Sequence, residues 1–226
     1  MPALVAGLQA ATAADITGTV TLKGTPPEEK VIDMSSIPDC SKQHSEPVKT
    51  QFYVVGGNGG LKDVVVAIRG VSKSTGASAA PLVLDQTKCE YVPYIAAVQT
   101  GQKISVKNSD PVLHNVDVIP AQAGNQPSNK AQTPGSPDIV MSFPAEENFL
   151  RFKCDVHPWM FAYVTVVDNP YYAVTDKDGK FKISDVPPGK YTIEALHRKA
   201  APKGMTKEIE VKPDGTVVDF TMDVPK

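Results

Sequence analysis

The chain has 226 residues, of which 41% are hydrophobic and 21% charged, so it is long enough to bury a core and too apolar to be disordered throughout. Its formal net charge of −2 provides no strongly basic surface, which argues against nucleic acid or an anionic membrane as a partner. The sequence contains no apolar run long enough to form a transmembrane segment.

The first 14 residues are small and mostly apolar, and they end in Ala13 and Ala14 just before Asp15. This pattern resembles the end of a secretory signal peptide, although the usual basic first region is missing. The alternative is a flexible tail. Together with the metal-binding motif described below, the pattern leads us to expect a periplasmic or secreted protein.

Short strands dominate the rest of the chain. Alternation of apolar and polar residues predicts strands over 16–22, 102–107 and 191–195, and the β-branched run 64–68 predicts a buried strand. Glycine- and proline-rich turns separate these runs, and no long helical period is present. Many short strands joined by such turns predict an all-β fold built from sandwiches.

Residues 120–138 are polar, small and rich in proline, which predicts a long loop. This loop would lie between two motifs that carry metal-ligating residues. It is either a tolerated surface insertion or a flap beside a metal site, and the sequence favours neither.

Four side chains in those two motifs form a complete ligand set. His114 closes the sequence Asn108-Ser-Asp-Pro-Val-Leu-His114, and Cys154, His157 and Met160 fall within seven residues. Two imidazoles, one thiolate and a weak axial thioether are the ligands of a mononuclear blue copper centre, which alternates between Cu(I) and Cu(II). We therefore predict one copper ion per chain, with Cys154 ending a strand and the other two ligands on the loop that follows.

The number of histidines excludes several copper enzymes. The chain has four histidines, too few for the trinuclear cluster of a multicopper oxidase, and a nitrite reductase needs a further three-histidine site. A dinuclear centre needs two cysteines in the ligand loop, where this chain has one. With Met160 in the fourth position no coordination site is left for a substrate, so we expect no enzymatic activity. We expect the other two histidines, His44 and His197, to be structural.

Two further cysteines remain, Cys40 and Cys89. In an oxidising compartment two such cysteines most simply form a disulfide. The alternative is a second metal site, because His44 follows Cys40 at a spacing that suits metal ligands. Such a site would be short of ligands unless it drew on the first.

The residues around the proposed ligands also resemble a known family. The motif that ends at His114-Asn115-Val116, together with the loop from Cys154 to Met160, is similar to those of the plastocyanin and azurin family, the cupredoxins, with an amicyanin-like ligand loop. The resemblance covers roughly residues 45–167 and implies a Greek-key β-sandwich domain, which we place at 15–168.

The resemblance also implies roles for the neighbours of the ligands. Asn115 would brace the two ligand loops and direct its backbone N–H at the Cys154 sulfur, and the N–H of Val156 could do the same. His157 would face solvent within an apolar patch that includes Pro111, Pro158 and, in one interpretation, Trp159, and a redox partner would dock there. The other interpretation, which we prefer, is that Trp159 only packs within the protein.

A second module is predicted after Asp168-Asn169-Pro170. The pattern from Thr175 through Asp178-Gly179 to Ile193 resembles the carboxypeptidase regulatory-like domain, a small prealbumin-like β-sandwich, which we place at 169–226. About fifty residues make a marginal sandwich alone, so we expect the strand at 16–23 to complete it. Asp176 and Asp178 provide too few ligands for calcium and are interpreted as turn residues.

These observations predict a blue copper protein that carries single electrons between redox proteins, such as a cytochrome or a dehydrogenase. The alternatives are a non-catalytic structural or accessory subunit of a larger assembly, suggested by the additional module, and a copper delivery protein.

Overall fold

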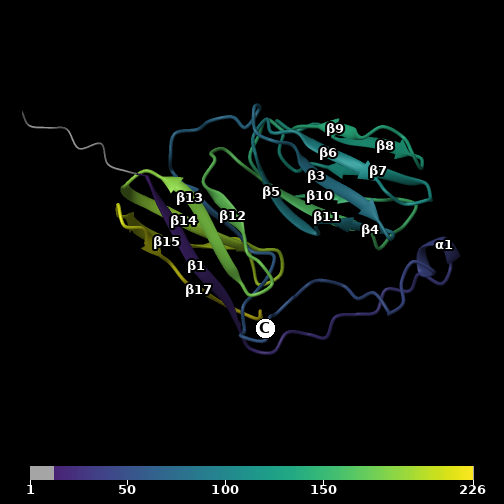
Figure 1. Cartoon of the computed structure of the whole chain (residues 1–226), viewed down its shortest axis with the longest axis horizontal. Coiled ribbons are helices and arrows are strands. Elements are labelled where there is room, and N and C mark those ends of the chain that lie inside the picture. Colours follow the sequence, from purple (N-terminus) through teal and green to yellow (C-terminus); the bar gives the residue numbers. More distant parts are fainter. Residues whose placement is uncertain (1–12, 226) are drawn as a thin grey trace, which may run out of the picture.

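The structure is a computed structural model that describes residues 13–225, so most of the signal-like segment 1–14 lies outside the described residues. It is almost entirely β, which confirms the predicted all-β fold. Figure 1 shows two groups of strands side by side, each built from two sheets. Within residues 13–225, no helix is long and apolar enough to cross a membrane.

The first group of strands forms a sandwich around a core that contains Leu150 and Phe152. Its five-stranded sheet has the order β5 (Ile95–Gln99), β11 (Phe161–Val167), β10 (Glu147–Lys153), β7 (His114–Ile119) and β8 (Ser128–Gln132). The facing sheet has the order β4 (Glu90–Val92), β3 (Leu82–Thr87), β6 (Ile104–Asn108) and β9 (Ile139–Met141). Alternate residues of these strands are buried, as expected where one face of each sheet covers the core.

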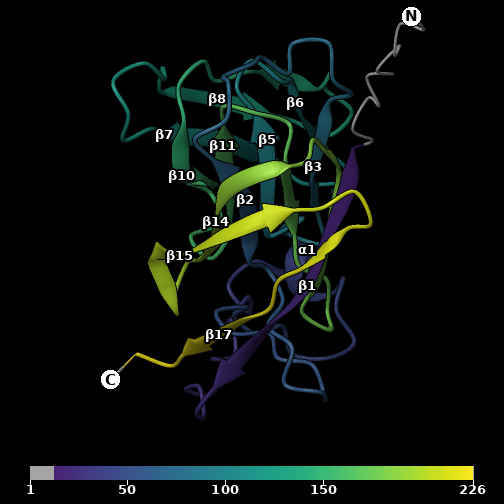
Figure 2. The same ribbon diagram turned by 90° about the vertical axis from the view of Figure 1, so that its left-hand side faces the viewer.

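The second group packs around a core that contains Ile16, Ile68 and Phe220. One sheet has the order β13 (Lys180–Val186), β1 (Ala14–Lys23) and β16 (Thr216–Val217), and β17 (Phe220–Asp223) also pairs with β1, as Figure 2 shows. The other has the order β12 (Tyr172–Val174), β2 (Val65–Arg69), β14 (Gly189–His197) and β15 (Ala201–Val211).

Sheet membership does not follow the predicted division of the chain at residue 168. The strand β1 pairs with three C-terminal strands, as expected for the strand at 16–23. The strand β2 lies between β12 and β14, although the predicted division placed it in the first domain. Both strands precede the first sandwich in the sequence. The run that forms β2 was correctly predicted to be a buried strand, but its apolar residues do not specify which sheet they join.

The segment between β1 and β2 leaves the second group of strands and crosses to the far end of the first (Figure 1). It contains the short helix α1 (Pro38–Ser41), and Cys40 of this helix forms a disulfide with Cys89 in the turn between β3 and β4. The predicted disulfide is thereby confirmed. His44 contacts the same turn, because its Nε2 lies 2.7 Å from the backbone oxygen of Lys88.

The prediction of a long loop over residues 120–138 is wrong in its central part. Residues 128–132 form β8, which pairs with β7 from Val118 opposite Ser128 to His114 opposite Gln132. Only Gln132 of this edge strand is fully buried. Because only one of its residues is buried, β8 lacks the alternation of apolar residues by which strands are predicted. Backbone pairing with β7 holds these residues as a strand.

Gly179 lies in the turn before β13, where its φ of +75° places it in the left-handed region. A Cβ atom there would lie 2.3 Å from the Val20 carbonyl oxygen and 2.7 Å from the Leu61 nitrogen. We expect Gly179→Ala to lower the free energy of unfolding by more than about 2 kcal/mol, because strain and overlap with backbone act together. Urea denaturation of the variant and the native chain measures the difference in the free energy of unfolding. Gly135→Ala is the control, since its φ is +74° but nothing lies within 4 Å of the added Cβ; an equal loss in both variants would contradict the steric argument.

His197 is buried at the end of β14, where its Nδ1 accepts hydrogen bonds from the backbone N–H groups of Lys199 and Ala200. Burial, together with the neighbouring positive charge of Arg198, lowers the pKa of His197 from 6.5 to about 4. Between these two pH values the unfolded chain binds a proton that the folded chain does not, so stability falls as the pH decreases through this window.

We expect His197 to account for a loss of up to about 3 kcal/mol in the free energy of unfolding between pH 7 and pH 4. His197→Asn keeps an oxygen that can accept the two hydrogen bonds but does not titrate. Urea denaturation at both pH values should show a smaller acid-induced loss in the variant than in the native chain. Identical losses would show that His197 does not contribute.

Candidate metal centre

Three neighbouring strands bring the predicted ligands to one end of the five-stranded sheet. His114 is the first residue of β7, Cys154 follows the last residue of β10, and Met160 precedes the first residue of β11. Because β10 runs antiparallel to both β7 and β11, these three strand ends are adjacent. His157 lies on the short connection between β10 and β11.

Three of the four predicted ligands have their ligand atoms close together. The Cys154 Sγ atom lies 3.8 Å from His114 Nδ1 and 3.5 Å from His157 Nδ1. The two Nδ1 atoms are 3.0 Å apart. All three side chains are buried, each at most 1% exposed. The two motifs, 40 residues apart in the sequence, therefore meet in a closed site.

Met160 closes the ligand loop through its backbone. Its N–H donates a hydrogen bond to the His157 carbonyl oxygen at 2.9 Å, and its carbonyl oxygen accepts one from the Cys154 N–H at 3.2 Å. The side chain is 1% exposed and belongs to the same core cluster as Cys154. These bonds fix the turn and keep Met160 beside the other ligands.

Asn115 joins the two motifs, as its position after His114 led us to expect. Its backbone N–H donates to the Cys154 sulfur at 3.5 Å, and its Oδ1 accepts the backbone N–H of Asp155 at 2.6 Å. Its Nδ2 donates to Asp155 and to Asn129 on β8, each at 2.8 Å. The segment around Asn129 thus supports the ligand loop as a fixed strand.

Asp110 holds the other side of His114. The Asp110 Oδ2 atom lies 2.8 Å from His114 Nε2, and both side chains are essentially inaccessible to solvent. A proton on Nε2 would be donated to the carboxylate, which leaves the lone pair of Nδ1 directed at the site. The same carboxylate accepts the backbone N–H groups of Lys88 and Cys89 at 2.5 and 2.7 Å.

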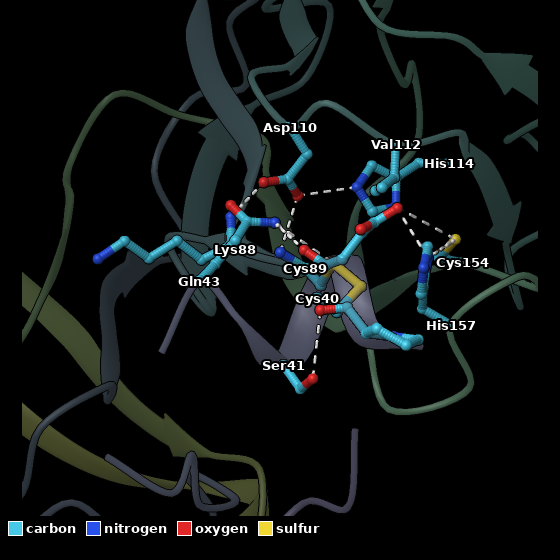
Figure 3. The surroundings of a disulfide bond; sticks show 12 residues. Cys40, Ser41, Gln43, Lys88, Cys89, Asp110, Val112, His114, Cys154 and His157 are labelled. Carbon is cyan, nitrogen blue, oxygen red and sulfur yellow. Dashed lines mark hydrogen bonds and ion pairs between the residues drawn. A yellow bond between two sulfur atoms is a disulfide. The ribbon is translucent and has the colours of Figure 1, made fainter. Parts of the chain in front are cut away.

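The disulfide forms one wall of this centre, as Figure 3 shows. Sulfur atoms of Cys40 and Cys89 and a ring nitrogen of His157 lie within 4.8 Å of one another. The Cys89 sulfur also lies within that distance of a nitrogen of His114 and an oxygen of Asp110. Cys40 and Cys89, which were not predicted to bind the copper ion, therefore lie directly beside the predicted ligands.

The expectation that His157 faces solvent is wrong, because its side chain is only 1% exposed. The segment that carries α1 places Cys40 beside the imidazole, and Trp159 lies against it with ring centroids 5.5 Å apart. The Trp159 Nε1–H donates to the Cys89 carbonyl oxygen at 3.0 Å, which agrees with a packing role for this residue. Cys40 precedes both ligand motifs in the sequence, so the motifs alone could not predict this part of the cover.

Burial and hydrogen bonding adjust the ionisation of the ligands. Burial opposes ionisation of Cys154, but the contact with the His114 imidazole and the hydrogen bond from the backbone N–H of Asn115 outweigh it and lower the thiol pKa below its ordinary value. Burial and the neighbouring His114 lower the pKa of His157 to about 4, so this imidazole is neutral at pH 7. A thiolate and a neutral imidazole are the forms that bind a metal ion.

The ligand atoms have the spacing that one metal ion requires. Nitrogen and sulfur atoms bound to one ion at about 2.0–2.3 Å lie roughly 3–4 Å apart. The three distances among His114, Cys154 and His157, from 3.0 to 3.8 Å, fall within this range. One thiolate with two imidazoles suits copper in both of its common oxidation states.

Sequence reasoning did not identify the roles of Asp110 and Tyr91. Asp110 is part of the first motif, but only the fold brings its carboxylate to both His114 and the turn at Cys89. Tyr91 is buried beneath the site, and its hydroxyl lies 3.3 Å from the Asn115 carbonyl oxygen. Burial raises the pKa of Tyr91 well above its ordinary value, so the phenol stays protonated.

Comparison with known proteins gives structural matches alone: no family model and no curated protein matches the sequence. The copper-containing nitrite reductase NirK from Thermus scotoductus SA-01 matches 40% of this chain at 18% identity and a TM-score of 0.36, and the match spans 23% of that chain. A methionine-to-alanine mutant of amicyanin, described as Cu(I), matches 45% of this chain at 20% identity and a TM-score of 0.34, and the match spans 97% of that chain. A purple cupredoxin from Nitrosopumilus maritimus matches 38% of this chain at 22% identity and a TM-score of 0.31, and the match spans 98% of that chain. The function of the chain is therefore argued from its own side chains.

Proposed function

We propose that this chain is a type 1 copper protein that carries single electrons between redox proteins outside the cytoplasm. His114, Cys154 and His157 would hold the ion, with Met160 as the weak axial ligand. The observation that carries this proposal is the buried group of one sulfur and two Nδ1 atoms, 3.0–3.8 Å apart. Copper held there supplies one-electron chemistry, because both Cu(I) and Cu(II) accept this ligand set.

The protein environment limits rearrangement at the site. Asn115 links both motifs, the Asp110 carboxylate orients His114, and backbone hydrogen bonds close the loop from Cys154 to Met160. Ligands fixed in this way change little between two oxidation states, which favours rapid electron exchange. The absence of a free ligand position in the proposed set also favours a carrier over an enzyme.

We propose that a redox partner docks where the ligand motifs reach the surface. Leu113 and Val156 are 44% and 43% exposed, and each is the immediate chain neighbour of a proposed histidine ligand. Pro111 is exposed as well. A small apolar contact of this kind suits a transient electron-transfer complex. Export from the cytoplasm is supported by the disulfide, which persists in an oxidising compartment.

The C-terminal strands favour a second role as an accessory module. Residues 169–226, completed by β1 and β2, surround a separate core and supply none of the proposed ligands. We propose that this part, for which we retain the resemblance to the carboxypeptidase regulatory-like domain, attaches the copper domain to a larger assembly. Isolation of the native protein at fixed stoichiometry with other subunits would support that role over a freely diffusing carrier.

A reductive titration tests the carrier function. Copper-loaded protein is titrated without oxygen with a one-electron reductant, reoxidised, and titrated again while visible absorption is recorded. We expect about one electron per copper, with the absorption recovered in each cycle, because the fixed ligands retain the ion. Loss of copper on reduction would instead favour a delivery protein and would contradict the proposal.

A further inference from the structure

We propose that Cys40 and Cys89, when reduced, form a second soft-metal site that binds Cu(I) beside the first. Their sulfur atoms lie within 4.8 Å of each other and of a ring nitrogen of His157, and all three residues are buried. The site differs from the one proposed above in its sulfur ligands and does not require Cys154. The disulfide would therefore decide whether the chain holds this second ion.

The chemistry of the three side chains suits Cu(I). Two thiolates and one imidazole are soft or borderline ligands, which Cu(I) prefers over the carboxylates that bind harder ions. The Cα atoms of Cys40 and Cys89 are 5.6 Å apart, so both side chains already point into one small volume. The Gln43 Nε2 atom, 3.9 Å from the Cys89 sulfur, is the polar side-chain group in hydrogen-bond contact with it.

The redox step balances with a dithiol as the reductant. Thiol–disulfide exchange transfers two electrons and two protons to Cys40 and Cys89, giving two thiols, while the dithiol becomes a disulfide. Binding of Cu(I) then releases the two thiol protons, and copper does not change its oxidation state. When both sites hold copper, His157 binds one ion through each ring nitrogen and releases its ring proton to solvent, because a neutral imidazole has a single lone pair.

The position of Cys40 makes the disulfide accessible by local opening. Helix α1 has one turn and no side-chain hydrogen bond at its N-terminus. Among the described residues, those between β1 and β2 form only α1 and isolated β-bridges. Around Cys40, the backbone hydrogen bonds donated within residues 34–44 join residues three or four positions apart. A segment held by such local bonds opens at lower free energy than a sheet, which gives a reductant access to the buried sulfurs.

His157 connects the two groups of ligands. Its Nδ1 lies 3.5 Å from the Cys154 sulfur, and a ring nitrogen lies within 4.8 Å of the other two sulfurs. Copper on the reduced pair would therefore be adjacent to the first site.

Copper stoichiometry tests the proposal. The 226-residue chain is reduced with a dithiol, which is then removed by desalting under nitrogen. The chain is equilibrated with Cu(I) in the presence of a Cu(I) chelator and analysed for copper. The oxidised chain and the Cys40→Ser/Cys89→Ser variant are treated identically, and near-ultraviolet circular dichroism monitors the fold. Alkylation followed by mass spectrometry reports which cysteines copper protects.

We expect the reduced native chain to hold about one more copper per chain than the oxidised chain or the double variant. Copper should protect Cys40 and Cys89 from alkylation. The Cys154→Ala variant should keep this additional copper, so the result does not depend on the blue copper proposal. Equal copper in the reduced and oxidised chains, additional copper retained by the double variant, or a disulfide that a dithiol reduces only by unfolding the chain would each overturn the proposal.

Discussion

The Cys154→Ala variant is expected to lose the strong visible absorption of the copper-loaded protein. This absorption would arise from charge transfer between the thiolate sulfur and Cu(II), and Cys154 supplies the sulfur that lies 3.5–3.8 Å from both imidazole Nδ1 atoms. His114 and His157 remain in the variant and can still bind Cu(II), but weakly and without the sulfur transition. Visible spectra at matched copper content measure the effect, which we expect to be at least about tenfold.

Met160→Leu is the matched control for that variant. It keeps the thiolate and both imidazoles and removes only the proposed weak axial ligand, so strong absorption should remain, although its wavelength can shift. Circular dichroism should show that both variants retain the β-sheet structure. A Cys154→Ala protein as strongly coloured as the native one would refute the assignment of Cys154 as the copper ligand.

The Asp110→Asn variant is expected to bind copper about 10–100-fold more weakly, the usual effect of removing a carboxylate that orients a histidine ligand. The native carboxylate accepts hydrogen bonds from the backbone N–H groups of Lys88 and Cys89 and lies 2.8 Å from His114 Nε2. An amide has one acceptor oxygen, so its NH₂ group would face at least one of these donors. Competition with a copper chelator gives the ratio of affinities.

Asp138→Asn is the control for Asp110, because it removes an exposed carboxylate that bonds only to Ser105 on the surface. Its copper affinity should equal that of the native chain. The visible spectrum of Asp110→Asn should also change, since the orientation of His114 is no longer fixed. Unchanged affinity and an unchanged spectrum would show that Asp110 does not position His114.

Local patterns in the sequence were sufficient to predict the all-β fold and three residues, His114, Cys154 and His157, whose ligand atoms meet in the structure. Alternation predicted the strands at 16–22 and 102–107, because one face of each covers a core. The ligand types alone predicted that His114 and the loop at Cys154 lie close together in the folded chain. The strand predictions succeeded because they depend on residues that are close in the chain. The meeting of His114, Cys154 and His157 agrees with the predicted ligand set, whose binding of copper stays a prediction.

The features that the sequence did not predict depend on contacts between distant segments. The burial of His157 follows from a disulfide that joins α1 to the turn at Cys89, 49 residues further along. The strand at 128–132 is held by backbone pairing with β7, and its side chains show almost no alternation of apolar and polar residues. The run at 64–68 has no feature that distinguishes one sheet from another. Long-range pairing determines each of these, and short-range periodicity does not encode it.

X-ray absorption at the copper edge of the native, Cu(II)-loaded protein tests the central claim most directly, because it identifies the atoms bound to the ion. The side chains at the site provide one thiolate sulfur and two imidazole nitrogens within bonding distance of one ion. We predict one short copper–sulfur bond and two copper–nitrogen bonds, with the sulfur contribution lost in Cys154→Ala. A copper ion surrounded only by nitrogen and oxygen atoms in the native chain would contradict the account.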